Sequence, residues 1–372
     1  MSVKDHIECV VIGAGVVGLG IGRALSVSGY QTLVLEKNPW IGNETSSRNN
    51  EIIHAGFLYE PGSLRAKLFP EACEALYEYC KKQGVKTINS GKLVFAVSDD
   101  EISILETMKR YAVEGDVKGV EIIGCTAVHK LEPELRCTAA LYSKTSGLVD
   151  SHGLMVAFLG EMEGSGGMLV LNTTVKGGRI KQNGFEVNVL TEGEKEFSFS
   201  CDVLVNAAGL GAQDFAENLC GFDKNRVPDL FLGKGSYFSF SGNVPFSRHI
   251  SPVGETQKMG GTLTFDLAGR AKFGPDFELI ETENYSVDVS RRKNFVRAIR
   301  RYWPALDEQK LRPDYAGIRP MLRPNRDVQH DDWLIDGPNE HGHKGLVHLF
   351  GLGSPGLTAS LTLGEYICSL VA

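Results

Sequence analysis

The 372-residue chain is 42% apolar and 23% charged, with a formal net charge of −7, a composition typical of a globular protein of about two domains. An acidic chain of this kind is not expected to be a general nucleic-acid binder. Its eight cysteines include no CxxC pair, which favours reduced core thiols in an intracellular protein. Since no apolar run approaches the roughly 18 residues of a membrane span, and we expect no signal peptide before the first strand, we predict a cytoplasmic protein. A removed targeting segment or peripheral membrane contact stays open.

The N-terminal segment predicts a βαβ unit, with a strand at 9–12, a helix at 16–28 and a strand at 31–35. Between the first strand and the helix lies a GxGxxG turn. Gly13 permits the tight turn, Gly15 lets the backbone approach a pyrophosphate, and Gly18 allows close helix packing. Glu36 ends the second strand, where an acidic residue binds ribose hydroxyls. The motif indicates a dinucleotide site, against the alternative of glycines that serve packing alone.

The candidate general base lies in the segment SSRNNEIIHAGFLYEPGSLRA, residues 46–66, which follows this unit on the side expected to face the cofactor. His54 stands in an apolar run beside Ala55 and Gly56. Its imidazole can therefore be desolvated, and histidine titrates near physiological pH as a general base should. The alternative is a hydrogen-bonded core histidine without a catalytic role.

The middle of the chain alternates helical and strand-like patterns. Helices are predicted at 64–84, 101–115, 127–132, 154–163 and 288–301, and strands at 91–97, 167–172, 185–190, 201–206 and repeatedly between 227 and 277. Tyr237 lies on one of these strands, whose alternation points it either to a substrate pocket or to the core. Arg319, in DYAGIRP, can bind a carboxylate bidentately, through two parallel N–H groups. Its alternative is a surface arginine in a turn.

The C-terminal segment repeats the arrangement of the first turn. A strand from about Trp333 leads to VHLFGLGSPGLTASLTLGEYI, in which Gly351, Gly353 and Gly356 precede a helix at 357–370. Two such turns at the two ends of the chain indicate one large cofactor, FAD, although helix capping by Ser354 and Pro355 is the alternative. The predicted cofactor-binding residues are Gly13, Gly15, Val16, Val17, Gly18, Glu36, Lys37, Ser46, Ser47, Arg48, Asn49, Val175, Ala208, Gly209, Gly351, Gly353, Ser354, Gly356 and Leu357.

Two clusters are not expected to carry chemistry. His341, His343 and His348 have partly metal-like spacing but lie around a Gly/Lys-rich turn, so we predict no metal site. The basic run at 291–303 is expected to be a solvated helix face, with membrane or partner docking as its alternative.

The order of these patterns predicts an α/β (α+β) fold with two interleaved domains. A Rossmann-like FAD-binding domain would comprise residues 1–85, 145–215 and 330–372. A mixed, largely antiparallel β-sheet substrate domain would comprise residues 86–144 and 216–329.

The motifs together resemble the FAD-dependent oxidoreductases of the D-amino-acid-oxidase superfamily, and most closely its L-2-hydroxyglutarate dehydrogenase branch. The resemblance rests on the 46–66 segment and on KGSYF, FDLAGRAKFGPD, YAGIRP and SPGLTASLTLGEYI. It implies oxidation of a small L-2-hydroxy acid to the 2-oxo acid, with hydride transfer to flavin N5 and electrons passed to an acceptor such as a quinone. It also implies that His54 is the base, that Arg319 lines the active site, and that Tyr59 and Tyr237 line the substrate pocket.

Three positions depart from the pattern of that branch. Thr262, in GGTLT, stands where relatives have a histidine and is therefore a candidate substrate contact that leaves the exact substrate open. Asn50 and Leu58 replace a usual Ser and Tyr. Covalent flavin attachment is a rival role for His54.

Three other functions stay open. An amino-acid oxidase would share the fold and the arginine. A glycerol-3-phosphate dehydrogenase would have an arginine where this chain has Leu58. A flavin-binding regulatory module would have no turnover.

Overall fold

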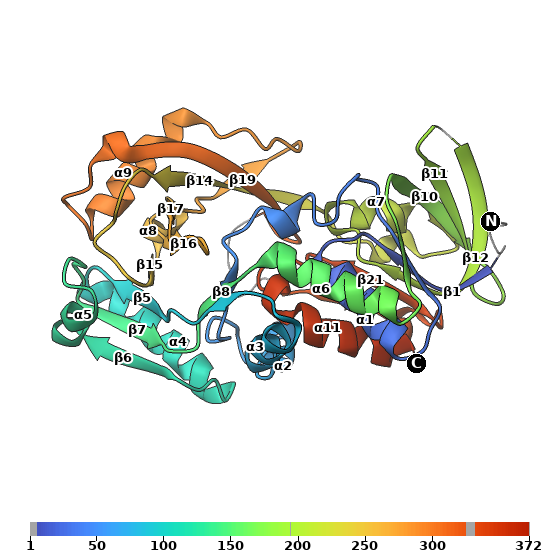
Figure 1. Ribbon diagram of the computed structural model, residues 1–372, viewed down its shortest axis with the longest axis horizontal. Coiled ribbons are helices and arrows are strands. Elements are labelled where there is room, and N and C mark those ends of the chain that lie inside the picture. The colour runs from blue at the N-terminus through green and yellow to red at the C-terminus, as the bar shows by residue number, and fades with distance from the viewer. Residues whose placement is uncertain (1–5, 194, 325–331, 372) are drawn as a thin grey trace.

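The computed structural model describes residues 6–193, 195–324 and 332–371. Two large sheets lie toward opposite ends of the molecule, with the helices α1, α6 and α11 packed beside one of them (Figure 1). A small third sheet contains β3 (Ile52–Ile53), β4 (Thr87–Ile88) and β8 (Gly147–Val149).

The first sheet has a parallel core in the order β9–β2–β1–β12–β21, extended by antiparallel strands. Its strands are β1 (His6–Ile12), β2 (Thr32–Leu35), β9 (Met168–Val170), β10 (Thr173–Ile180), β11 (Phe185–Thr191), β12 (Lys195–Asn206), β13 (Leu219–Cys220), β20 (Leu334–Asp336) and β21 (Leu346–Phe350). The central strands are apolar almost throughout because both faces of a parallel sheet are covered.

Alternate residues of these central strands belong to two different hydrophobic clusters. One face carries Cys9, Val11 and Val34 against α1 (Val16–Val27), α3 (Ala72–Gln83), α6 (Ser151–Gly164) and α11 (Gly356–Val371). The other face, with Val10 and Leu33, packs against α7 (Ala212–Glu217) and β11. This two-sided burial holds the carboxyl ends of β1, β2, β12 and β21 at one common edge.

The second sheet is largely antiparallel, with one parallel pair between β5 and β15. Its strands are β5 (Lys92–Ala96), β6 (Val120–Gly124), β7 (Ala139–Ser143), β14 (Phe231–Phe240), β15 (His249–Pro252), β16 (Leu263–Phe265), β17 (Ala271–Phe273), β18 (Glu278–Ile280) and β19 (Leu311–Met321). The remaining helices are α2 (Leu64–Leu68), α4 (Ile102–Glu114), α5 (Cys125–Leu131), α8 (Glu255–Lys258), α9 (Arg292–Arg300) and α10 (Pro338–His341).

The predicted mixed α/β fold class is confirmed, and one predicted helix is wrong. Residues 64–84 form two helices, α2 and α3, because Pro70 lies between them and cannot continue a helix. β13 follows the predicted domain boundary at residue 216 yet pairs with β10 in the first sheet. Over the part of the chain that the structure describes, no helix has the length and apolarity needed to cross a membrane.

Candidate active site

A large cavity opens at the carboxyl ends of the parallel strands and extends to the second sheet. Ile12, Leu35, Ala207 and Leu349 line it from the ends of β1, β2, β12 and β21. Ligands of open α/β sheets bind at this edge. Elements of the second sheet, including β5, β14, β15 and β19, close the far end.

The glycine-rich turn brings bare backbone to the cavity wall. Gly13 has φ +99° and a Cβ there would lie 2.7 Å from the Ala207 carbonyl oxygen, so no side chain fits without a shift. A Cβ at Gly15, the first residue before α1, would lie 3.0 Å from Ser46 Oγ. The N-cap Gly15 has no side chain to cap α1, and Ser46 Oγ accepts from the Val16 backbone N. This glycine-rich turn fits a pyrophosphate, whose oxygens accept from backbone N–H groups at a helix N-terminus.

Glu36 is positioned by three hydrogen bonds. It is buried, Oε2 accepts from the Ala14 backbone N at 2.8 Å, and Oε1 accepts from the backbone N and Nδ2 of Asn38 at 2.9 and 2.8 Å. An ionised carboxylate has about four acceptor positions. One position is therefore left for a ribose hydroxyl, which fits the predicted role. The neighbouring Lys37 lines the same cavity and forms an ion pair with Glu44 at 2.7 Å.

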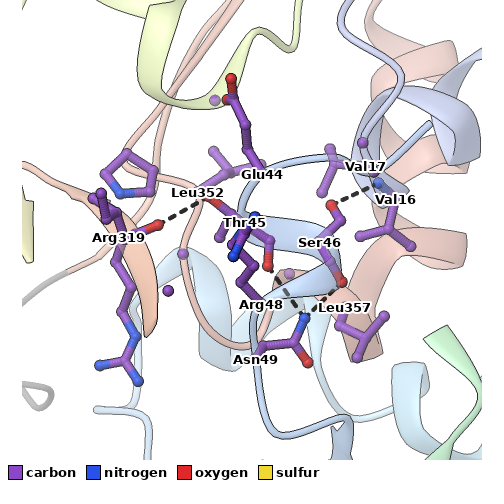
Figure 2. Close-up of a pocket in the computed structure, with 18 of the residues that line it drawn as sticks. Val16, Val17, Glu44, Thr45, Ser46, Arg48, Asn49, Arg319, Leu352 and Leu357 are labelled. Atoms are coloured by element: carbon purple, nitrogen blue, oxygen red, sulfur yellow. Dashed lines mark hydrogen bonds between the residues drawn. The ribbon is translucent and has the colours of Figure 1, made fainter. Parts of the chain in front are cut away.

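The loop after β2 lines the cavity and is held by hydrogen bonds of the adjacent residues Thr45 and Ser46 (Figure 2). Ser46 Oγ accepts from the Val16 backbone N at 3.0 Å, at the first turn of α1. Thr45 Oγ1 donates to the Ile318 carbonyl of β19 at 2.9 Å, and Asn49 Nδ2 donates to the Ser46 carbonyl at 2.7 Å. The loop therefore joins the glycine-rich turn to the second sheet, and Thr45 is a lining residue that the sequence analysis did not include.

Most of the predicted cofactor residues meet at this cavity. The lining includes Gly13, Gly15, Val16, Val17, Gly18, Glu36, Lys37, Ser46, Arg48, Asn49, Val175, Ala208, Gly209, Gly353, Ser354, Gly356 and Leu357. Ser47 and Gly351 do not line it. Gly351 directly follows β21, and a Cβ there would lie 2.6 Å from the Leu322 side chain, too close to fit without a shift. The N-terminus of α11 lies at the cavity wall, where Gly356 and Leu357 are lining residues.

His54 follows β3 and lies half-buried on the cavity wall. Its backbone N donates to Thr358 Oγ1 at 3.1 Å, and its Nε2 lies 3.5 Å from Ser354 Oγ. Burial, then the positive charges of Lys92 and Arg319, lower the pKa of His54 to about 3. The imidazole is therefore neutral at physiological pH, with one ring nitrogen able to accept a proton.

Arg319, on β19, also lines the cavity. Within the described residues its guanidinium makes no hydrogen bond or ion pair. Figure 2 shows the side chain extending away from the start of α1. A half-buried guanidinium at a cavity wall is a ready binding group for a carboxylate.

Tyr237 and Thr262 lie on the same end of the cavity. Tyr237 is 3% exposed and stacks on Tyr315, with 4.4 Å between ring centroids. Thr262 is buried, and its Oγ1 lies 3.0 Å from Ser251 Oγ. Both residues line the cavity, together with Lys92, Ser251 and Gln257, which the sequence analysis missed. Those three carry no local motif. The pairing of β5 with β15 brings Lys92 and Ser251 to the site, and α8 carries Gln257.

The structure places Tyr59 outside the cavity lining. The chain leaves the wall at Leu58, and the Tyr59 ring packs on Phe69 with centroids 5.2 Å apart. Tyr59 belongs to a separate hydrophobic cluster with Phe69, Ala72 and Trp333. Its predicted substrate contact therefore has no support in the geometry.

Among the histidines near the C-terminus, His348 lies in a packed, hydrogen-bonded environment. His348 is fully buried, with Nδ1 3.0 Å from Asn206 Nδ2 and its ring against Phe222. Among the residues described, no three His, Cys, Asp or Glu side chains gather in a way that could hold a metal ion.

The fold and the cavity are those of a dinucleotide-binding protein, whose cofactor would be held at the carboxyl ends of the parallel strands of the first sheet. Residues 8–370 match the family described as "FAD dependent oxidoreductase", DAO, and the chain belongs to that family. Family membership and the bare backbone at Gly13 and Gly15 agree on FAD as the cofactor.

Similar proteins cover nearly the whole chain. An Arabidopsis thaliana protein named "L-2-hydroxyglutarate dehydrogenase, mitochondrial" is 35% identical, over 98% of this chain and 83% of its own. A "Glycerol 3-phosphate dehydrogenase" of Caloramator mitchellensis is 26% identical, over 98% of this chain and 73% of its own. The solved L-alpha-glycerophosphate oxidase of Mycoplasma pneumoniae, with FAD bound, has a TM-score of 0.87 at 21% identity, over 99% of this chain and 95% of its own. That structure shares the fold.

Proposed function

We propose that this enzyme oxidises an L-2-hydroxy acid to the 2-oxo acid, with L-2-hydroxyglutarate as the first candidate. The observation that carries the proposal is the presence of neutral His54 and the guanidinium of Arg319 on the wall of one cavity, beside the FAD-binding elements. The name of the Arabidopsis relative supports the choice of substrate.

Two residues of the chain would have different roles in the reaction. Arg319 binds the C1 carboxylate through paired N–H groups and so orients C2. His54 accepts the hydroxyl proton, and Nε2, beside Ser354 Oγ, is the nitrogen we assign to this step. Removing that proton avoids a high-energy protonated ketone as C2 loses its hydride. FAD, when bound, supplies the acceptor for the hydride.

The cofactor would be held by the glycine-rich turn, Glu36, the loop through Ser46 and the N-terminus of α11. Tyr237 would contact the substrate from the second sheet, beside Thr262. An acceptor such as a quinone would then take the electrons onward.

A single anaerobic titration tests the substrate class. Purified enzyme is mixed with L-2-hydroxyglutarate, glycerol 3-phosphate, glycine or a D-amino acid, and the oxidised-flavin absorbance is followed. We expect rapid bleaching by L-2-hydroxyglutarate. Bleaching by glycerol 3-phosphate alone would favour a glycerol-3-phosphate dehydrogenase, and bleaching by glycine or a D-amino acid would indicate an amino-acid oxidase. No bleaching by any 2-hydroxy acid would contradict the proposal.

A further inference from the structure

The first turn of α11 holds the main chain of His54 through one buried hydroxyl group. Thr358, the third residue of α11, is 1% exposed and lines the cavity. Its Oγ1 accepts from the His54 backbone N at 3.1 Å and donates to the Ile52 carbonyl of β3 at 3.3 Å. One side chain therefore satisfies two main-chain groups, and one of these belongs to the residue assigned as the general base.

The position of β3 explains why this hydroxyl is needed. β3 is the edge strand of the third sheet, and the Glu51 carbonyl accepts from the Val149 backbone N of β8 at 3.0 Å. Because the main-chain groups of successive strand residues point to opposite sides, the Ile52 carbonyl and the His54 N–H face away from β8. Thr358 bonds to both groups on that side, as a neighbouring strand would. Without the hydroxyl each group would lose this partner, and a buried main-chain group without a partner is costly.

The start of α11 is itself held by a second element. Arg65 of α2 is 5% exposed and donates from Nη1 to the Ser354 carbonyl at 3.4 Å and from Nε to Asp332 Oδ1 at 3.3 Å. Ser354 Oγ lies 3.5 Å from Nε2 of the His54 ring. The main chain and the ring of His54 thus both meet residues 354–358, a segment that is fixed to α2.

A second threonine of α11 shows the ordinary alternative. Thr362 lies one turn further along the helix, is half-buried, and donates to the Ala359 carbonyl of its own helix at 3.2 Å. Threonine hydroxyls in helices commonly bond to a carbonyl of the preceding turn. Thr358 instead bonds outside its helix, to β3, and so links two elements.

We propose that Thr358 is a positioning residue, which sets the place of the His54 imidazole relative to the cofactor by linking β3 to the start of α11. The inference rests on the proposed function for the role of His54 as the base. Gly356 and Leu357, at the start of the same helix, line the cavity. One helix terminus would therefore contact FAD and also hold the base. A misplacement of about 1 Å at a reacting group costs on the order of 10²-fold in rate.

A double-mutant cycle tests whether Thr358 acts through His54. Thr358→Val removes the hydroxyl and keeps the branched shape, so the limiting rate of flavin reduction by L-2-hydroxyglutarate should fall about 10- to 100-fold. The substrate concentration at half-maximal rate should change less than about 2-fold, since ground-state binding is untouched. Thr358→Ser keeps the hydroxyl and should retain a rate within about 3-fold of wild type. In the His54→Ala background, Thr358→Val should change the rate less than about 2-fold, because the base is already absent.

Thr362→Val is the matched control, because it removes the same hydroxyl from the same helix without touching β3, and it should change neither rate nor half-maximal concentration. An unchanged rate in Thr358→Val would overturn the inference. So would an equal loss in the His54→Ala background, since Thr358 would then act on the cofactor or the fold. If Thr358→Val does not fold, Thr358→Ala, whose smaller side chain leaves room for a bridging water molecule, takes its place in the cycle.

A spectroscopic measurement needs no substrate and separates this inference from the proposed function. In FAD-loaded enzyme labelled with ¹⁵N-histidine, the His54 signals are those absent from His54→Ala. Thr358→Val should speed exchange of the His54 amide proton about 2- to 10-fold and shift the resonances of its ring nitrogens, whereas Thr358→Ser and Thr362→Val should not. If this pattern holds while L-2-hydroxyglutarate fails to bleach the flavin, the proposed function fails and the positioning role stands. If bleaching occurs without this pattern, the positioning role fails alone.

Discussion

At the scale of single residues, the site depends on what surrounds each titratable group. His54 is kept neutral by burial and by the positive charges of Lys92 and Arg319, and Arg319 is the group proposed to bind the substrate's C1 carboxylate. A bound carboxylate would offset the charge of Arg319 and raise the pKa of His54, so the basicity of His54 would increase when substrate binds.

Replacing His54 tests its role as the base. His54→Ala should lower the rate of flavin reduction by L-2-hydroxyglutarate about 10²- to 10⁴-fold, because a positioned general base contributes that much. FAD should stay bound, since the Gly13–Val16 backbone, Glu36 and Ser46 are untouched. Stopped-flow spectroscopy measures the rate and the flavin spectrum measures occupancy. Turnover near wild type would exclude His54 as the base, and release of FAD would point to a covalent or structural role.

The lowered pKa of His54 predicts an unusual pH profile. The neutral imidazole is the active form, and it persists at every pH above the lowered pKa of the folded enzyme. We therefore expect kcat/KM to stay nearly constant from pH 8 down to about 5.5, without the loss near 6.5 of an ordinary histidine. Steady-state rates in buffers of constant ionic strength measure this. An acidic limb with a midpoint near 6.5 that is absent from His54→Gln would contradict it.

At the scale of secondary-structure elements, α1 and α11 both have their N-termini at the cavity. The two helices pack against each other at glycine residues. A Cβ at Gly364 of α11 would lie 2.4 Å from the Gly20 carbonyl of α1, and a Cβ at Gly20 would lie 2.4 Å from the Ser360 carbonyl. The distance between α1 and α11 is therefore set by the close approach of their backbones at these glycines. The positions of both N-termini at the cavity depend on that distance.

A single methyl group tests this crossing. Gly364→Ala should destabilise the fold by about 1–3 kcal/mol through overpacking, and it should weaken FAD binding. Gly160→Ala is the control, because Gly160 lies on α6 with open space around its Cβ position. It should be neutral or stabilising by up to about 1 kcal/mol. Urea unfolding of both variants measures the change in the free energy of unfolding. Equal stability of the two would show that the helices can separate at little cost.

At the scale of the whole molecule, one cavity joins the two large sheets. Its lining comes from the glycine-rich turn at one end of the chain, the α11 turn at the other, and β5, β14, β15 and β19 between them. A bound FAD would therefore contact segments from nearly the full length of the sequence, and cofactor binding and folding should be linked.

Removal of FAD tests that linkage. Apoprotein should be less stable than enzyme with FAD at 100 times its Kd, by about 2.7 kcal/mol if the cofactor binds only the folded state. Its Tm should fall by several degrees and recover when FAD is added back. Scanning calorimetry measures both, with ADP as a partial ligand for comparison. An unchanged Tm would mean that the cofactor adds no net stability.

Local sequence patterns determined the βαβ unit and the GxGxxG turn, because glycine geometry and apolar periodicity act over a few neighbouring residues. They also singled out His54 and Arg319 as chemical groups, and the whole-chain resemblance predicted the fold class, which the structure confirms. The local patterns wrongly predicted a single helix at 64–84, because Pro70 separates α2 from α3.

Only the tertiary structure decided which side chains share the cavity. Lys92 and Ser251 lie far apart in sequence and meet through the register of β5 with β15, while Tyr59, only five residues from His54, turns away to pack on Phe69. Strand pairing and core packing depend on contacts between distant segments, and these leave no local pattern to find.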